Sequence, residues 1–329
     1  FNKFSLYIIP FAMAAIFIRV FLDSRTAFIT HVTMILVCAV EVRYQYEFVI
    51  IQIVGGLVAI YSLRELSKRS QIYLTAVLVT LASTVVYLAI QLIQSDDPSK
   101  LDQSMYIYFA INGFFLLFTY PLMLVIEKAF GFTSTVTLFE LSNTNNYLLR
   151  RLSEVAPGTF QHSIMVGNLA AEIANRIGAK AHLVRTGALY HDIGKMANPA
   201  FFTENQAGVN PHEKLSCQES ARIIISHVSE GTRLAEKFNL PTAIREFITT
   251  HHGKGLASFF YVSYKNEHPD EEVDETLFRY PGPNPSTLEQ AILMMCDSVE
   301  AASRSLPEYT EESIASLVNK IIDAQTANG

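Results

Sequence analysis

The sequence predicts an all-helical protein in two parts, several membrane-spanning helices followed by a water-soluble helical domain. Charged residues are sparse before residue 127, whereas the rest of the chain has an ordinary soluble composition. The mean hydropathy of +0.24, with 17% charged residues, is too apolar for a soluble protein and too charged for a chain that is membrane throughout. Apolar residues of the second part recur at helical spacing, and no segment alternates like a strand.

Five stretches of the first part are candidate membrane spans. A bilayer core about 30 Å thick requires about 20 apolar residues in a helix, and residues 72–94 and 104–126 are uncharged and long enough. Residues 48–63 are shorter, and residues 4–18 and 26–40 are borderline in length. We expect about five spans, with three as the minimum, in a multi-pass protein of the cell (inner) membrane that has the lipid bilayer as a partner.

The loops between the spans predict the orientation. The loop RELSKRS, residues 64–70, carries three basic residues, whereas residues 95–100 carry two aspartates and one lysine. The positive-inside rule places the first loop, and everything after residue 126, in the cytoplasm. Five spans then leave Phe1 outside, so we expect the whole protein to have further N-terminal sequence. His31 lies in a candidate span, where a neutral imidazole hydrogen-bonded between helices is favoured over a functional ionisable group.

Helix-start and helix-stop residues divide the second part. The expected boundaries are a cap at Thr159, a stop at Gly178, an end near Asp192, a stop at Gly231, a start at Pro241 and a stop at Gly253. Two more helices are expected within residues 286–306 and 310–325. The predicted organisation is a transmembrane region at residues 1–126, a connector at 127–157 and a helical domain at 158–329.

Charge and cysteine content exclude some classes of function. The net charge of −6 argues against a nucleic-acid polymer as partner, because counterion release requires clustered Lys and Arg. The three cysteines are scattered without CxxC pairing, which predicts neither a disulfide framework nor a thiolate zinc site.

Histidine is concentrated in the second part, which holds eight of the nine. The candidate metal ligands each fall on a predicted helix or at its end, and they are His162, His191, Asp192, His227, His251, His252 and Asp297. Imidazole and carboxylate are the mixed N/O donors that suit Fe, Mn or Zn. A single helical His, or an HD dipeptide alone, occurs often by chance, so the prediction depends on the whole ordered set.

The doublets His191–Asp192 and His251–His252 favour a centre with two metal ions. Adjacent helical residues point about 100° apart and rarely face one ion, but an aspartate can bridge two ions with its two oxygens. Two ions about 3.5–4 Å apart stabilise the attacking and leaving oxygens of a phosphoryl displacement and lower the pKa of a water molecule. Lys195, one turn past Asp192, is the expected cation for the phosphate oxygens.

The ligand order resembles that of the HD-domain metal-dependent phosphohydrolases. The stretches LLRRLSEVAPGTFQHSIMVGNLAAEIA, YHDIGKMANPAFFTENQ, NPHEKLS, HHG, FRYPGPNP and DSVEAASRSL look like the cytoplasmic domain of the seven-transmembrane-receptor HD family, and IPFAMAAIFIRVFLDSR looks like part of its membrane region. Characterised members of that family hydrolyse cyclic di-AMP, so the resemblance implies a membrane-anchored phosphodiesterase of bacterial second-messenger signalling that yields linear 5′-pApA. It also implies an N-terminal extracellular sensor domain absent from this chain, and it leaves a homodimer open.

The resemblance implies two divalent ions, manganese or iron, with Asp192 and Lys195 as catalytic residues. One ion would be held by His162, His191, Asp192 and Asp297, and the other by His227, His251 and His252, with Asp192 bridging. The related HD-GYP enzymes carry a GYP after their HHG-type histidines, and its absence here argues against cyclic di-GMP.

Loop residues between the ligand helices are candidate nucleotide contacts. They are Asn205, Gln206, His212 and Arg279, and for each an ordinary loop role is an equal alternative. Two other functions stay open. One is hydrolysis of another nucleotide, such as cyclic di-GMP, guanosine tetraphosphate or a deoxynucleotide; the other is a receptor that binds nucleotide without turnover.

Overall fold

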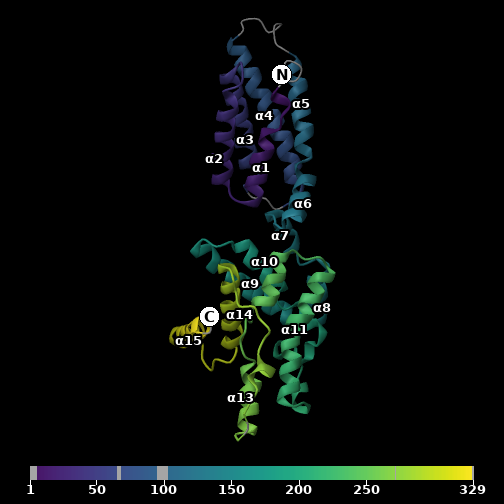
Figure 1. The fold of residues 1–329 in the computed structure, drawn as a ribbon, viewed down its shortest axis with the longest axis vertical. Helices are drawn as coiled ribbons and strands as arrows, with labels where there is room; N and C mark the ends of the chain where they lie inside the picture. Colours follow the sequence, from purple (N-terminus) through teal and green to yellow (C-terminus); the bar gives the residue numbers. More distant parts are fainter. Residues whose placement is uncertain (1–5, 65–67, 95–102, 271, 328–329) are drawn as a thin grey trace. The chain divides into compact units, whose positions relative to one another are not determined.

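The structure, a computed structural model, describes residues 6–64, 68–94, 103–270 and 272–327. These residues form helices joined by turns and loops, and among them the only β-structure is one isolated bridge between Leu256 and Arg279 (Figure 1). The all-helical prediction is therefore confirmed. The contacts divide the chain into two compact units, Phe1–Phe139 and Glu140–Gly329.

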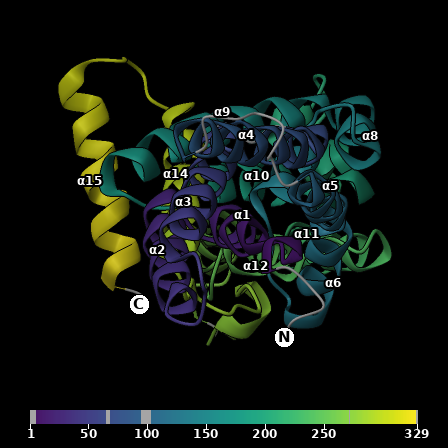
Figure 2. The same ribbon diagram turned by 90° about the horizontal axis from the view of Figure 1, so that it is seen from above.

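The first unit is a bundle of apolar helices, which Figure 2 views from above. Its elements are η1 (Leu6–Ile8), α1 (Phe11–Phe21), α2 (Ser24–Ala39), α3 (Gln45–Ser62), α4 (Ser70–Gln94), α5 (Ser104–Leu117) and α6 (Thr119–Phe130), and α7 (Thr135–Leu141) crosses the boundary between the units. Among the described residues, Gln45–Ser62, Ser70–Gln94 and Ser104–Phe130 are long and apolar enough to cross a membrane. Leu6–Phe21 and Ser24–Ala39 are shorter apolar helices. The predicted minimum of three spans is met.

The predicted span over residues 104–126 lies within the apolar segment Ser104–Phe130, whose helix is interrupted at Phe118, between α5 and α6. Pro121 follows three residues later. Proline has no N–H to donate, and its ring collides with the carbonyl group four residues earlier, here that of Leu117. The break therefore falls where the helical hydrogen-bond ladder loses a donor.

His31 links two helices of the first unit. Its Nε2 lies 2.9 Å from the carbonyl oxygen of Gln52 on α3, and the ring is buried. A Cβ added to Gly56 would lie 2.1 Å from that nitrogen, so a glycine is required where α3 packs against the ring. His31 has the structural, interhelical role that the sequence favoured.

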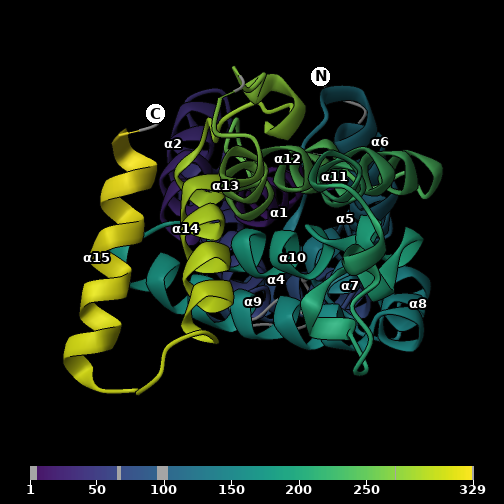
Figure 3. The same cartoon turned by 90° about the horizontal axis from the view of Figure 1, so that it is seen from below.

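The second unit packs its helices around separate apolar clusters. Its helices are α8 (Tyr147–Val155), α9 (Pro157–Ile177), α10 (Ala181–Tyr190), α11 (Cys217–Lys237), α12 (Thr242–Thr250), α13 (Ser258–Glu267), α14 (Leu288–Ser303) and α15 (Glu311–Ala327). Short 3₁₀ turns connect them: η3 (Ile193–Ala197), η4 (Pro199–Phe201), η5 (Thr203–Asn205), η6 (Pro211–Lys214) and η7 (Glu275–Phe278). Helix α9 packs on α10 and α14, and α15 lies beside α14 (Figure 3). Val166, Ala188, Phe247 and Leu293 fill the space between α9, α10, α12 and α14.

Two predicted helix boundaries are wrong. Helix α9 begins after Ala156 because Pro157 suits the first turn, and the Thr159 hydroxyl bonds Glu204 instead of capping. Helix α11 continues past Gly231 to Lys237. A Cβ at Gly231 would lie 2.9 Å from the Ile248 side chain, so this glycine serves a close approach.

Other boundaries agree with the sequence. Gly178 ends α9 with a φ of +75°, and Gly253 follows α12 with a φ of +53°. Both conformations favour glycine.

Candidate metal centre

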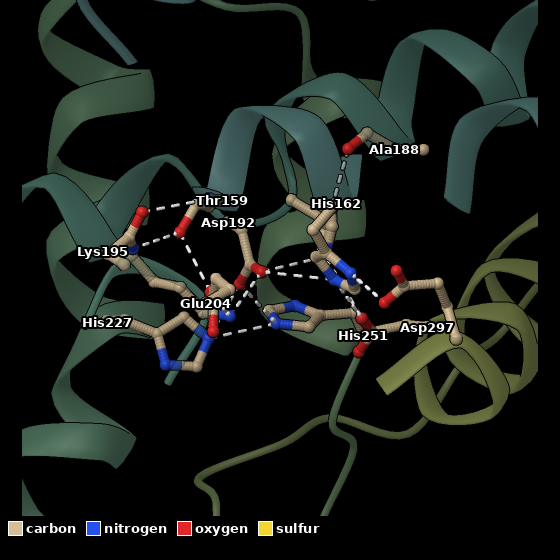
Figure 4. Close-up of polar contacts among 12 residues, drawn as sticks. Thr159, His162, Ala188, Asp192, Lys195, Glu204, His227, His251 and Asp297 are labelled. Carbon is tan, nitrogen blue, oxygen red and sulfur yellow. Dashed lines mark hydrogen bonds and ion pairs between the residues drawn. The ribbon is translucent and has the colours of Figure 1, made fainter. Parts of the chain in front are cut away.

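All seven predicted metal ligands come together in the second unit. Figure 4 labels His162, Asp192, His227, His251 and Asp297 among them. His162 comes from α9, His191 and Asp192 from the end of α10, His227 from α11, His251 and His252 from the end of α12, and Asp297 from α14. Six of them are at most 6% exposed, and His252 is half-buried. Because α10 and α12 end at their doublets, the adjacent residues of each doublet can both turn toward one centre.

The ligand atoms form two groups, each with its atoms within 4.8 Å of one another. We call them the Asp cluster (His162, His191, Asp192 and Asp297) and the His cluster (His227, His251 and His252).

The carboxylate of Asp192 lies between the two clusters. Its Oδ2 is 3.2 Å from Nε2 of His191, in the Asp cluster. Its Oδ1 is 3.4 Å from Nε2 of His227 and 3.6 Å from Nε2 of His251, in the His cluster. One oxygen therefore faces each cluster, as a bridging ligand requires.

Backbone carbonyl groups orient three of the imidazoles. Nδ1 of His191 donates to Ala188 O at 2.7 Å, Nδ1 of His227 to Ile224 O at 2.6 Å, and Nδ1 of His251 to Ile248 O at 2.9 Å. A carbonyl oxygen only accepts, so the proton of each neutral ring is on Nδ1 and the lone pair is on Nε2. This is the usual arrangement around a metal-binding histidine.

Two further features are those expected of a site that binds a cation. Nε2 of His227 and Nε2 of His251 are only 3.1 Å apart, although both present lone pairs when the rings are neutral. Neither carboxylate oxygen of the buried Asp192 accepts a well-formed hydrogen bond, and Lys195 pairs with it only as an ion. Five imidazoles and two carboxylates, without a thiolate, suit a divalent ion that prefers nitrogen and oxygen donors.

His162 is oriented by a carboxylate that the sequence analysis missed. Nδ1 of His162 lies 2.5 Å from Glu300 Oε2, and its Nε2 lies 2.8 Å from Asp297 Oδ1. Arg304 in turn donates to Glu300 Oε1 at 2.6 Å. Asp297 and Glu300 are three residues apart on α14 and share a helix face, a signal that could have identified Glu300.

The pKa values differ between the two clusters. Burial would raise the pKa of Asp192, but the positive charges of His191 and Lys195 outweigh burial and hold it well below its usual range. Burial would lower the pKa of His191, but Asp192 and Asp297 raise it to about 10. Burial lowers the pKa of His227 to about 3, so this member of the His cluster is neutral at pH 7.

Lys195 lies between two carboxylates. Its Nζ is 2.7 Å from Asp192 Oδ2 and 2.9 Å from Glu204 Oε1, and it lies over the Phe202 ring at 4.9 Å. Burial would lower the pKa of Lys195, but Asp192 and Glu204 outweigh burial and raise it. The lysine is therefore a permanent cation beside Asp192.

All four candidate nucleotide contacts are bonded within the protein, Arg279 to Glu275 and Lys254, and the other three as follows. Asn205 donates to the Thr159 hydroxyl at 2.8 Å, and Gln206 approaches Asn210 at 3.4 Å. Nε2 of His212 lies 2.9 Å from the Phe201 carbonyl. None of the three belongs to either cluster, and their contact with a nucleotide stays a prediction.

A cavity of about 770 Å³ opens beside the His cluster. Its lining includes His251, His252, Lys254, Arg279 and Tyr280. Arg279, the fourth candidate contact, reaches the cavity while its guanidinium group lies 2.6 Å from Glu275 Oε2. The Tyr280 ring stacks on His252 at 4.1 Å between centroids, a contact that no sequence signal had indicated. The volume falls in the range of about 300–1,000 Å³ that is usual for small-molecule sites.

Comparison with known proteins agrees with this geometry. Residues 1–134 match the family "7TM receptor with intracellular HD hydrolase", and residues 159–302 match the HD domain. The chain is 36% identical to the cyclic-di-AMP phosphodiesterase PgpH of Bacillus subtilis, over 98% of this chain and 46% of that protein. It is also 36% identical to PgpH of Listeria monocytogenes, over 98% of this chain and 45% of that protein. The chain thus spans slightly less than half the length of these relatives.

Solved structures resemble the second part of the chain. The crystal structure of the HD domain of L. monocytogenes PgpH is 42% identical with a TM-score of 0.53, and the match covers 56% of this chain and 86% of that one. The complex of that domain with cyclic di-AMP is 43% identical with a TM-score of 0.55, and the match covers 57% and 87%.

The fold and the two clusters define an HD-domain protein. More narrowly, the chain belongs to the family of 7TM receptors with an intracellular HD hydrolase, and it is a membrane protein.

Proposed function

We propose that this chain is a membrane-anchored phosphodiesterase that hydrolyses cyclic di-AMP to linear 5′-pApA. The observation that carries the proposal is the placement of Asp192, with one carboxylate oxygen toward each cluster of ligands. The relatives' names and the solved complex with cyclic di-AMP support this substrate. The proposal assigns residues 1–126 to a transmembrane region, 127–157 to a connector and 158–329 to a cytoplasmic HD domain.

The proposed cofactors are two divalent ions, manganese or iron. The Asp cluster would hold one and the His cluster the other, with Asp192 shared. When bound, such ions supply Lewis acidity to a phosphodiester and lower the pKa of a water nucleophile. The chain's own residues have two further roles. Asp192 directs one carboxylate oxygen toward each cluster, and Lys195 provides a fixed positive charge for a non-bridging phosphate oxygen.

The cavity beside the His cluster supports a substrate with more than one phosphate. Lys254 and Arg279 line it and add cationic groups outside the metal centre. A cyclic dinucleotide has two phosphodiesters, so one can be cleaved at the clusters while these residues meet the other. A mononucleotide would leave that part of the cavity unused.

The decisive experiment replaces the bridging carboxylate. In a metal-replete assay, Asp192→Ala should lose cyclic di-AMP turnover while circular dichroism shows an unchanged helical content. Asp323→Ala, which removes an exposed aspartate on α15, is the matched control and should keep full activity. Wild-type turnover by D192A would contradict the mechanism.

Assays on the same purified protein distinguish this proposal from two alternatives, hydrolysis of another nucleotide and nucleotide binding without turnover. Product analysis with cyclic di-AMP, cyclic di-GMP, guanosine tetraphosphate and deoxynucleotides identifies the substrate. A receptor without turnover would bind nucleotide and consume none of it, even with two metal ions per chain.

A further inference from the structure

Asp192 Oδ2 has two competing uses in this site. It is the oxygen that faces the Asp cluster, and it is also the partner of the Lys195 ammonium group at 2.7 Å. A carboxylate oxygen that ligates a divalent ion loses most of its attraction for a neighbouring ammonium group, because the ion neutralises its charge. Lys195 would then be a buried cation beside a divalent cation, which is costly without a second negative partner.

Glu204 is that second partner, and its position is set independently of Asp192. Its Oε1 accepts from Lys195 Nζ at 2.9 Å and from the Thr159 hydroxyl at 2.9 Å. Asn205, the next residue, accepts from the Thr159 backbone N–H at 3.1 Å and donates to its hydroxyl at 2.8 Å. A Cβ at Gly158 would lie 1.8 Å from the Glu204 carbonyl oxygen, so η5 packs directly on the first turn of α9.

We infer that Glu204 is a positioning residue that retains the Lys195 ammonium group in the site when Asp192 binds a metal ion. This inference rests on the proposed metal centre and deepens it. Glu204 allows the Asp cluster to take up its ion without expelling the lysine that is to meet the phosphate. The Glu204–Lys195 pair is then worth more in the metal-bound protein than in the metal-free protein.

The test measures Mn²⁺ binding to the metal-stripped chain in detergent micelles by isothermal titration calorimetry, a readout that does not depend on turnover. Glu204→Gln keeps an acceptor for Thr159 but removes the charge, and it should raise the Kd of one Mn²⁺ step about tenfold, the scale of a charge-assisted hydrogen bond. Lys195→Met removes the competing cation, so K195M should bind Mn²⁺ at least as tightly as wild type. In the K195M background, E204Q should have no further effect on the Kd.

A purely structural role for Glu204 gives the opposite pattern. Such a role would make E204Q weaken Mn²⁺ binding whether or not the Lys195 ammonium group is present. The inference is overturned if E204Q weakens binding equally in the K195M background, or if E204Q binds both ions as tightly as wild type. If the wild-type chain bound no Mn²⁺, the proposed function itself would fail.

Discussion

Gly194→Ala should disable the centre although Gly194 is not one of the seven candidate ligands. Gly194 lies in η3, two residues after Asp192, where η3 crosses α11. A Cβ at this position would lie 1.8 Å from the carbonyl oxygen of His227 and 2.5 Å from the backbone nitrogen of Gly231. Real Cβ atoms essentially never come within 3.0 Å of such atoms, so η3 and α11 would have to separate by more than an ångström.

That separation acts on the two clusters directly. Asp192 moves with η3 and His227 moves with α11, and their facing atoms are now 3.4 Å apart. Overpacking of this kind costs about 1–3 kcal/mol of folding stability, and a misplacement of about 1 Å in a catalytic site costs on the order of 10²-fold in rate. We therefore expect G194A to fold with a lowered Tm and to lose about two orders of magnitude in turnover.

The assay compares kcat for cyclic di-AMP hydrolysis and the thermal melting of G194A with those of Gly167→Ala. Gly167 lies on α9 against α10, where an added Cβ would meet the Ala188 methyl group at 3.3 Å, a contact that a small adjustment relieves. G167A should stay close to wild type in both measurements. If G194A kept wild-type turnover and Tm, the close approach of η3 and α11 would not position the centre, and the reasoning would be refuted.

Two further predictions concern the histidines. Glu300→Gln removes the negative charge that contacts Nδ1 of His162, and it should weaken Mn²⁺ binding about 10- to 100-fold in a calorimetric titration. The control is E308Q, at an exposed glutamate. Unchanged Mn²⁺ binding by E300Q would contradict this prediction. In the metal-free protein, the raised pKa of His191, about 10 against an ordinary 6.5, stabilises the fold fully below pH 6.5, and this is lost as the pH rises toward 10. Melting with a chelator should therefore show Tm falling over that range, and Mn²⁺ should raise Tm more at pH 9 than at pH 7; equal shifts would count against it.

The ligand set could be predicted because it depends on residue type and helix ends. His191–Asp192 and His251–His252 are adjacent in the sequence, and the glycines that follow them indicate helix ends. A doublet at a helix end is a local feature, which a single sequence contains. The long uncharged runs of the first part are equally local, and they predicted the three apolar segments that can cross a membrane.

The two wrong helix boundaries concern residues whose role depends on a neighbour distant in the sequence. Thr159 is a good N-cap by type, but its hydroxyl contacts Glu204, which is 45 residues away. Gly231 is a good helix stop by type, but it is required where α11 approaches Gly194 and Ile248. Local propensity is a weak preference, and tertiary contacts override it.

The sequence by itself determined the all-helical class, the apolar spans and the identity of the seven candidate ligands, because these follow from composition, period and helix-ending residues. Only the tertiary structure decided that one oxygen of Asp192 faces each cluster. It also decided that Glu300 supports His162 and that Glu204 shares Lys195 with Asp192. Those roles depend on distances of a few ångströms between helices far apart in the chain, which no local pattern specifies.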